Sequence, residues 1–473
     1  MRKKDKKIPS EEQELKDSMP GKNQLKSNLK MGFWLASNGT RAFSDSILSP
    51  FIPLYGSTLN ASSTQIGFIV SITSLLSIIQ LLWAYLAQKF HVARSIAIIA
   101  SYISSLFNFL FLPIRNIFSF ASLRGVQSIT FSATLPTSSN ILAERTPPKS
   151  WPLQNSLLQG ILVVGTLIGT LIGGVILWKV DSNLRYPLIF IGAGVISIIS
   201  AIFFHIAVPS RKKMESKGRW RQIEEVDLTF GNTLAAMRTD KNFVVFILVN
   251  FIFVFGVNLS GPFYILFNTS QDYYNLTVFQ AALLTSIGLV PQTISSIVTA
   301  KLIEKVRKKE LLMVAGIFAS LFPIFFMIPF LAGRVTNVFW ILVIFWSVNG
   351  LAWGIINSSL TTLLLDIIHP RRRTLQLAIS NSLSAIALFI APILGGFIIE
   401  KSNLFYVIFI VSASIRFAGV LLFGFVKEPI IGGTILRPIQ RIIPYILRTN
   451  AEKGVTLLIT TKPPKRNRSK QKE

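Results

Sequence analysis

Long apolar stretches alternate with short polar segments along almost the whole chain. A membrane-spanning helix needs about 20 apolar residues. Twelve stretches meet this length, near residues 32–56, 64–88, 95–113, 117–143, 152–178, 186–208, 242–267, 277–303, 310–332, 335–367, 373–399 and 403–427. Most segments between them are short, which indicates that neighbouring helices run antiparallel in one bundle. The pattern predicts an all-α polytopic membrane protein with twelve transmembrane helices.

The longest connecting segment divides these stretches into two groups of six. The predicted domains are a disordered tail at 1–30, an N-terminal half at 31–208, a middle loop at 209–241, a C-terminal half at 242–427 and a basic tail at 428–473. Lysine and arginine crowd the tails, the middle loop and every second short connection. Because positive residues favour the cytoplasmic side, we expect a multi-pass protein of the cell membrane with both termini in the cytoplasm.

Composition supports the membrane assignment and excludes several other classes. Only 15% of the residues are charged, against about 25% in soluble proteins. The chain has no cysteine, which excludes disulfides and thiolate metal sites. Its three histidines lie in separate segments, and it has no phosphate-binding loop or dinucleotide motif, so we expect no metal, no cofactor and no enzyme activity. The basic residues behind the net charge of +27 crowd the tails and particular loops and are nearly absent from the apolar stretches, so nucleic acid is not an expected partner.

Two ionisable residues lie one helical turn apart inside the first apolar stretch. Arg41 and Asp45 share a helical face with Trp34, Asn38 and Ser49. A charged side chain at the bilayer centre costs roughly 2.5–3.5 kcal/mol and usually marks a functional site. We interpret this face as the lining of a polar cavity in which Asp45 holds a proton. The alternative is an internal Arg41–Asp45 pair whose charges only neutralise each other.

The two groups of six stretches carry an internal repeat. Residues of like chemistry recur at an offset of 222 late in each half and of 212 at its start: Gln127 with Asn349, Gly173 and Gly174 with Gly395 and Gly396, Asn38 with Asn250, and Pro50 with Pro262. Two such copies form a parallel repeat with a seam where a substrate can be reached from alternate sides. The repeat is broken where charge matters, since Asp45 corresponds to Val257 and Arg124 to Trp346.

Several motifs in this arrangement resemble those of the major facilitator superfamily over residues 32–427. The connection after the second helix of each half, AYLAQKFHVAR and AKLIEKVRKK, is similar to that family's G-x-L-a-D-r-x-G-R motif. The fourth helix carries Arg124-Gly-Val-Gln127-Ser128, which is similar to R-x-x-Q-G. The fifth helix resembles the glycine motif of the drug/proton antiporters, with Thr170 in place of its proline and Pro392 at that place in the second copy. The resemblance implies a transporter that works by alternating access.

These observations define four groups of candidate residues. For proton coupling we expect Arg124, which cannot deprotonate, to face Asp45 and favour its ionised form, with Arg41 beside them; the alternative is a permanent structural ion pair. The expected substrate cavity contains Asn38, Gln127, Asn250, Asn258, Trp346 and Asn349. The expected cytoplasmic gate contains Gln88, Lys89, Glu144, Glu304, Lys305 and Asp366. Helix packing is assigned to Gly165, Gly169, Gly173, Gly174, Pro392, Gly395 and Gly396.

The fifth-helix glycines and Arg416 leave further questions open. Glycines at every fourth residue let another backbone approach closely, either as plain packing or as a sliding surface between the two halves. Arg416 lies in the middle of the twelfth stretch, and we expect it to pair with a carbonyl or a polar neighbour.

The sequence favours proton-linked export of a small amphipathic organic compound. The first alternative is uptake of a sugar or other small solute, by symport or facilitated diffusion. The second alternative, from another class, is a membrane receptor that transports nothing. The expected partners are a small-molecule substrate, protons or another coupling ion such as sodium, and the lipid bilayer, and we expect a monomer.

Overall fold

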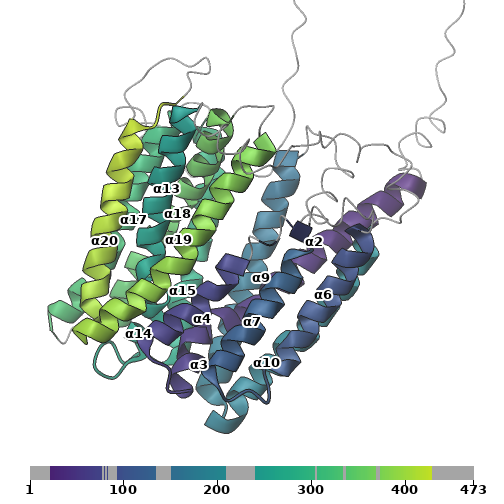
Figure 1. Cartoon of the computed structure of the whole chain (residues 1–473), viewed down its shortest axis with the longest axis horizontal. Helices are drawn as coiled ribbons and strands as arrows, with labels where there is room; N and C mark the ends of the chain where they lie inside the picture. The colour runs from purple at the N-terminus through teal and green to yellow at the C-terminus, as the bar shows by residue number, and fades with distance from the viewer. Residues whose placement is uncertain are drawn as a thin grey trace, which may run out of the picture.

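The computed structural model describes residues 22–76, 79, 82–83, 93–134, 151–208, 240–303, 306–333, 337–368 and 373–428. Helices form the regular structure of these residues, and no strand occurs among them. Figure 1 shows two helical bundles side by side, with the early helices in one bundle and the late helices in the other. This is the all-α architecture in two halves that the hydrophobic pattern predicts.

The described helices fall on all twelve predicted stretches. The first half contains α2 (Lys22–Leu48), the 3-10 turn η1 (Ser49–Phe51), α3 (Ile52–Thr58), α4 (Ser63–Leu76), α6 (Ala93–Leu110), α7 (Ile117–Ser132), α9 (Trp151–Lys179) and α10 (Ser182–Ala207). The second half contains α13 (Lys241–Ser260), α14 (Phe263–Thr269), α15 (Val278–Ile287), α16 (Leu289–Leu302), α17 (Lys308–Leu331), α18 (Val338–Ile367), α19 (Arg373–Ser402), α20 (Phe405–Leu422) and the turn η6 (Phe423–Phe425).

By length and composition, eight helical segments within the described residues are long and apolar enough to cross a bilayer. They are Leu157–Lys179, Ser182–Ala207, Lys241–Thr269, Val278–Leu302, Lys308–Leu331, Val338–Ile367, Ile379–Ser402 and Phe405–Phe425. One predicted boundary is wrong: α2 begins at Lys22, inside the predicted disordered tail. Residues 22–30 include lysine, glutamine and leucine, which are good helix formers, so the spanning helix extends beyond its apolar part.

Proline breaks the first helix of each half at equivalent places. In the first half, α2 ends at Leu48, and Pro50 lies in the 3-10 turn that leads into α3. In the second half, Gly261 and Pro262 separate α13 from α14. Proline has no backbone N–H to donate and its ring clashes with the preceding turn, which weakens a helix at that point and favours a break there. The matching positions of the two breaks are the structural counterpart of the repeat at offset 212.

Serines join the first and sixth helices of each half. Ser37 Oγ donates to Ser200 O at 3.0 Å, and Ser200 Oγ donates to Ser37 O at 2.8 Å, which ties α2 to α10. In the second half, Ser412 Oγ donates to Gly256 O at 2.7 Å and lies 2.9 Å from Ser260 Oγ, which ties α13 to α20. Hydrogen bonds of this kind hold helices together where water does not compete.

The halves meet through their second and fifth helices. The second helix of the first half, α4, packs against α19, and the fifth helix, α9, packs against α15. These two pairings exchange places under the repeat, as a two-fold axis along the membrane normal requires. We call the membrane side at which α2 begins and α20 ends the terminal side, and the other the opposite side; both ends lie at the top of Figure 1.

Candidate functional site

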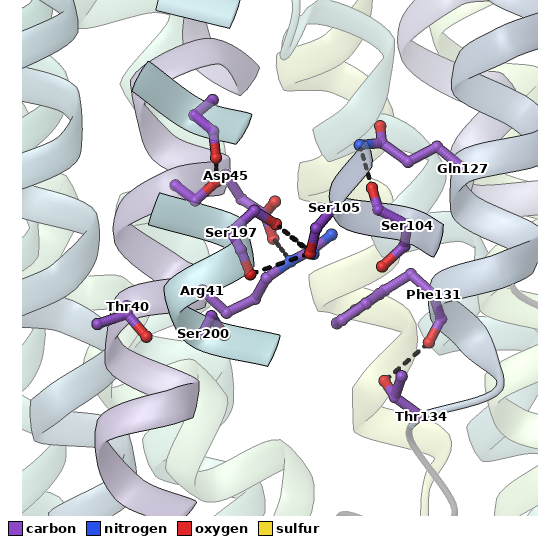
Figure 2. Close-up of polar contacts among 12 residues, drawn as sticks. Thr40, Arg41, Asp45, Ser104, Ser105, Gln127, Phe131, Thr134, Ser197 and Ser200 are labelled. Atoms are coloured by element: carbon purple, nitrogen blue, oxygen red, sulfur yellow. Dashed lines mark hydrogen bonds and ion pairs between the residues drawn. The ribbon is translucent and has the colours of Figure 1, made fainter. Parts of the chain in front are cut away.

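Arg41 and Asp45 form an ion pair within α2, in the middle of the first half. Arg41 Nε lies 3.0 Å from Asp45 Oδ2. Arg41 Nη1 donates to Ser197 Oγ of α10 at 2.8 Å, and the guanidinium lies 4.1 Å from the centre of the Phe131 ring of α7. Figure 2 shows this side chain reaching from α2 toward Ser197 and Ser105. Arg41 therefore has an anion, a hydroxyl and an aromatic face as partners.

The Asp45 carboxylate is more accessible than its partner. Its side chain is 45% exposed, whereas that of Arg41 is 13% exposed. Isolated charges are expensive inside a membrane, and those that occur usually face the bundle interior or water. The internal pair that the sequence offered as an alternative is therefore present, but it leaves one carboxylate face open.

Arg124 of α7 lies near this pair but is not joined to it. Its Nη1 donates to Gln127 Oε1 at 3.3 Å, and its Nε is buried without a hydrogen-bond partner. Arg41 and Asp45 are the charges that act on its guanidinium. In the described conformation the Asp45 carboxylate pairs with Arg41, and the expected contact between Asp45 and Arg124 stays a prediction. An arginine one turn away on the same helix reaches the carboxylate with little loss of side-chain freedom, which favours this partner.

A polar network from α6 and α10 surrounds the two arginines. Ser197 Oγ donates to Ser105 Oγ at 3.0 Å, and Ser105 Oγ is also 2.9 Å from Ser197 O. Gln127 Nε2 donates to Asn108 Oδ1 at 3.0 Å and to Ser104 O at 3.1 Å. Sequence reasoning placed Gln127 here but missed Ser105, Asn108, Ser197 and Phe131. The signal for α6 was present, because Ser101, Ser104, Ser105 and Asn108 recur at helical spacing.

The predicted cavity amides differ in how far their hydrogen bonds are satisfied. Asn38 and Asn258 each donate to a carbonyl of their own helix at 2.8 Å, at Trp34 O and Val254 O. Asn250 Nδ2 donates to Ser384 Oγ of α19 at 3.2 Å, while its Oδ1 is buried without a partner. A second group, Trp346 Nε1 and Asn349 Oδ1 of α18, is also buried without partners.

One predicted gate residue lies among the described residues. Asp366, at the end of α18, forms an ion pair with Lys308, the first residue of α17. Nearby, Arg307 Nε lies 3.8 Å from Glu428 Oε2, and Glu428 Oε1 accepts from Lys308 N at 2.9 Å. This network joins three segments of the second half on the terminal side. The other predicted gate residues, Gln88, Lys89, Glu144, Glu304 and Lys305, lie outside the described residues.

The glycines of α9 pack mainly inside the first half. A Cβ added at Gly165, Gly169 or Gly173 would strike backbone of α2, at Gly39, Phe43 and Ile47 respectively. These three glycines therefore allow α9 to pack closely on α2 within the first half. Of the two alternatives, this is plain helix packing and not a sliding surface between the halves. Their neighbour Gly174 does face the other half, where its added Cβ would meet Ala282 Cβ of α15 at 2.6 Å.

The second repeat has the same division of roles. A Cβ at Gly395 would strike Leu259 of α13 in its own half, and one at Gly396 would strike Ser63 of α4 in the first half. Pro392 presents its carbonyl to Gly67 of α4. In both repeats, one glycine of an adjacent pair packs within its half and the next packs across the seam.

Comparison with known proteins decides the family. Residues 35–273 and 246–438 match the pattern of the Major Facilitator Superfamily. The chain belongs to the major facilitator superfamily. It is a multi-pass membrane transporter of small molecules and not an enzyme. A search of curated proteins gives no match.

Solved structures share the fold of this superfamily member at low sequence identity. The nucleoside transporter NupG is 16% identical with a TM-score of 0.64, over 85% of this chain and 100% of that one. The xylose transporter XylE from E. coli, in a partially occluded inward open conformation, is 16% identical with a TM-score of 0.60, over 85% and 97%. A bacterial metal transporter is 12% identical with a TM-score of 0.58, over 83% and 97%. The drug/proton antiporter branch stays a prediction.

The two halves of the protein are joined on the opposite side, away from the start of α2. Thr64 Oγ1 of α4 donates to Glu400 Oε2 of α19 at 2.6 Å, across the seam. Trp178 of α9 stacks on Phe279 of α15 with ring centres 5.5 Å apart, and Phe68 meets Phe389 at 6.5 Å. Together with the glycine contacts, these interactions keep the two halves together on this side of the membrane.

The second half of the protein contains a buried arginine without a carboxylate partner among the described residues. Arg416 of α20 is 2% exposed. Its guanidinium donates to Gly256 O at 3.3 Å, Val257 O at 3.0 Å, Ala319 O at 3.3 Å and Ser260 Oγ at 2.9 Å. The expected carbonyl and polar partners are thus present, and they come from α13 and α17. Arg416 fastens three helices of one half and does not join the two halves.

Proposed function

We propose that this protein is a secondary transporter that moves a small polar organic solute by alternating access. Asp45 is the group that carries the coupling proton. The observation that carries the proposal is the Arg41–Asp45 pair, whose carboxylate is 45% exposed within a membrane helix. A carboxylate with an open face, beside cations at Arg41 and Arg124, can gain and lose a proton as its surroundings change. Intramembrane ionisable groups in transporters commonly serve as proton relays.

A polar solute is favoured over an amphipathic one by the unpartnered groups of the second half. Asn250 Oδ1, Trp346 Nε1 and Asn349 Oδ1 are buried without hydrogen bonds in the described conformation. Buried polar atoms nearly always have partners, so such groups need an explanation. Hydroxyl and amide groups of a bound solute would supply the missing hydrogen bonds. The solutes named for NupG and XylE, nucleoside and xylose, belong to this chemical class.

The test is gradient-driven flux in proteoliposomes that contain the purified full chain. Labelled D-xylose, uridine and D-gluconate serve as probes, with an inward proton gradient imposed. We expect the wild type to accumulate at least one probe along the proton gradient. Asp45→Asn should lose this accumulation but still exchange labelled for unlabelled solute, since exchange needs no net proton movement.

The matched control is Asp181→Asn, which removes an exposed carboxylate at the start of α10. It should accumulate solute as the wild type does. Accumulation that survives Asp45→Asn, or that stays the same without a proton gradient, would overturn the coupling role. The absence of any flux would overturn the transport proposal for these solute classes.

The second candidate is proton-linked export of an amphipathic compound. The observation that favours it is the close packing of α9 on α2 through Gly165, Gly169 and Gly173, in the segment that resembles the antiporter motif. The same vesicles distinguish the two, because export requires solute to move against the proton flow and uptake requires it to move with that flow. We place both termini in the cytoplasm on the distribution of lysine and arginine.

A further inference from the structure

The midmembrane site of the first half carries two described cations and one anion. Arg41 and Arg124 are positive, and Asp45 is the negative charge that acts on both. Arg41 contacts the carboxylate, Ser197 and the Phe131 ring. Arg41 contacts one oxygen of the carboxylate, Oδ2, while the Asp45 side chain stays 45% exposed. Arg124 is the charged group of this site that forms no ion pair among the described residues.

Arg124 is held in place by its surroundings but is not satisfied by them. Its one hydrogen bond in the described part of the chain runs from Nη1 to Gln127 Oε1 at 3.3 Å, and its Nε is buried without a partner. Gln127 is itself fixed, because its Nε2 donates to Asn108 Oδ1 and Ser104 O. The amide therefore positions the guanidinium from one side. The remaining donors of the planar fork suit a ligand with two acceptor oxygens.

We propose that Arg124 binds an anionic group of the transported solute, a carboxylate or a phosphate. The inference rests on the proposed transport function and specifies the substrate class of that site. A guanidinium matches both groups, since two N–H bonds can run in parallel to two oxygens. A bound anion would also balance the excess positive charge, which water does only weakly inside a membrane protein. A cationic solute would have to compete with Arg41 for the carboxylate of Asp45.

The same geometry couples the anion to the proton. Protonation of Asp45 removes the negative charge near Arg124, so it strengthens the binding of an anion there. Because coupling between two binding sites is reciprocal, the bound anion in turn favours protonation of Asp45. The charged groups that face Asp45 are Arg41 on its own helix and Arg124 on α7; α9 and α10, which pack on α2, carry their described charged residues near their ends. Proton and anion therefore move together, as in symport.

The experiment compares solutes that differ only in the anionic group. Binding to the purified full chain in lipid nanodiscs is measured by calorimetry for D-gluconate against D-glucose, and for D-ribose 5-phosphate against D-ribose. We expect at least one anion to bind at least about tenfold more tightly than its neutral counterpart, the equivalent of one charge-assisted hydrogen bond. Arg124→Gln should remove this difference, and Arg124→Lys should keep only part of it.

Two controls separate recognition from structural damage. Arg115→Gln makes the same charge change at an exposed residue and should leave binding unchanged. Asp45→Asn removes the negative charge near Arg124, so it should bind the anion more tightly than the wild type does at the same pH. Thermal unfolding of each variant shows whether it is folded.

Three results would overturn the inference. These are binding of the neutral solutes as tight as that of the anions, failure of both anions to bind, and anion binding that Arg124→Gln leaves intact. Gradient-driven flux of a neutral sugar alone would leave the proposed transport function standing while this inference fails. Loss of all flux would instead remove the transport function.

Discussion

Gly396 is the residue at which a single methyl group should open the seam between the halves. An added Cβ would strike the backbone of Ser63 and would lie 2.7 Å from Thr64 Cα, both in α4 of the other half. These are backbone atoms, so no side chain can rotate away to make room. Gly396→Ala can be accommodated only if α19 and α4 separate on the opposite side. We expect the substitution to shift the protein toward a conformation that is open there.

The size of the shift follows from the cost of overpacking. Forcing one extra methyl group into a close-packed contact costs about 1–3 kcal/mol. Because the strain exists only while the two halves are in contact, the whole of it acts on the equilibrium between the closed and open conformations. A change of this size moves that equilibrium by roughly 5- to 150-fold.

The assay measures the distance between nitroxide labels on the two halves. The chain contains no cysteine, so Asn183→Cys and Asp272→Cys introduce the sole thiols. Both residues are exposed, and they lie on the opposite side in the first and second half respectively. Double electron–electron resonance should show a longer distance population in Gly396→Ala than in the labelled parent.

Gly169→Ala is the matched control because it overpacks a contact within one half. Its added Cβ would lie 3.1 Å from Phe43 C of α2. It should lower the unfolding temperature but leave the distance distribution unchanged. A distribution for Gly396→Ala that equals that of the parent would refute the reasoning, as would the same widening in Gly169→Ala.

Three further substitutions test other parts of the structure. Glu400→Gln weakens the acceptor for Thr64 Oγ1 and should shift the label distances in the same direction as Gly396→Ala, but by less. Arg416→Lys keeps a buried charge but cannot reach three helices at once, and each charged hydrogen bond lost should lower the free energy of unfolding by about 1.5–3 kcal/mol; an unchanged thermal stability would contradict this. The side chain of Asn116 caps α7, because its Oδ1 accepts from Phe118 N at 2.8 Å. Asn116→Ala removes this cap and should lower the free energy of unfolding by about 0.5–2 kcal/mol, measured in the same way.

The helices and the repeat could be predicted because their signals are local or periodic. An apolar length reports a spanning helix wherever it occurs, and the pairing of Pro50 with Pro262 reports the same break in both halves. The Arg41–Asp45 pair could also be predicted from the sequence, since two residues four apart on a helix are neighbours in any fold. The start of α2 could not be predicted, because the lysines in its first turns are equally common in unfolded tails.

Contacts that depend on how helices rotate against one another could not be predicted. The sequence contains the pair Gly173 and Gly174, but it does not say that the first packs on α2 and the second on α15. The partners of Gln127 on α6, Asn108 and Ser104, could not be predicted for the same reason. Those of Arg416 are largely backbone carbonyls, which every residue possesses and which therefore leave no mark in the sequence.

The carbonyl partners of Arg416 have a consequence for the biogenesis of the protein. The final span enters the bilayer with a guanidinium near its middle, at an insertion cost of roughly 2.5–3.5 kcal/mol for an isolated helix. Its acceptors lie on α13 and α17, which the ribosome makes earlier. The last helix is thus best integrated after those two have already assembled beside the translocon.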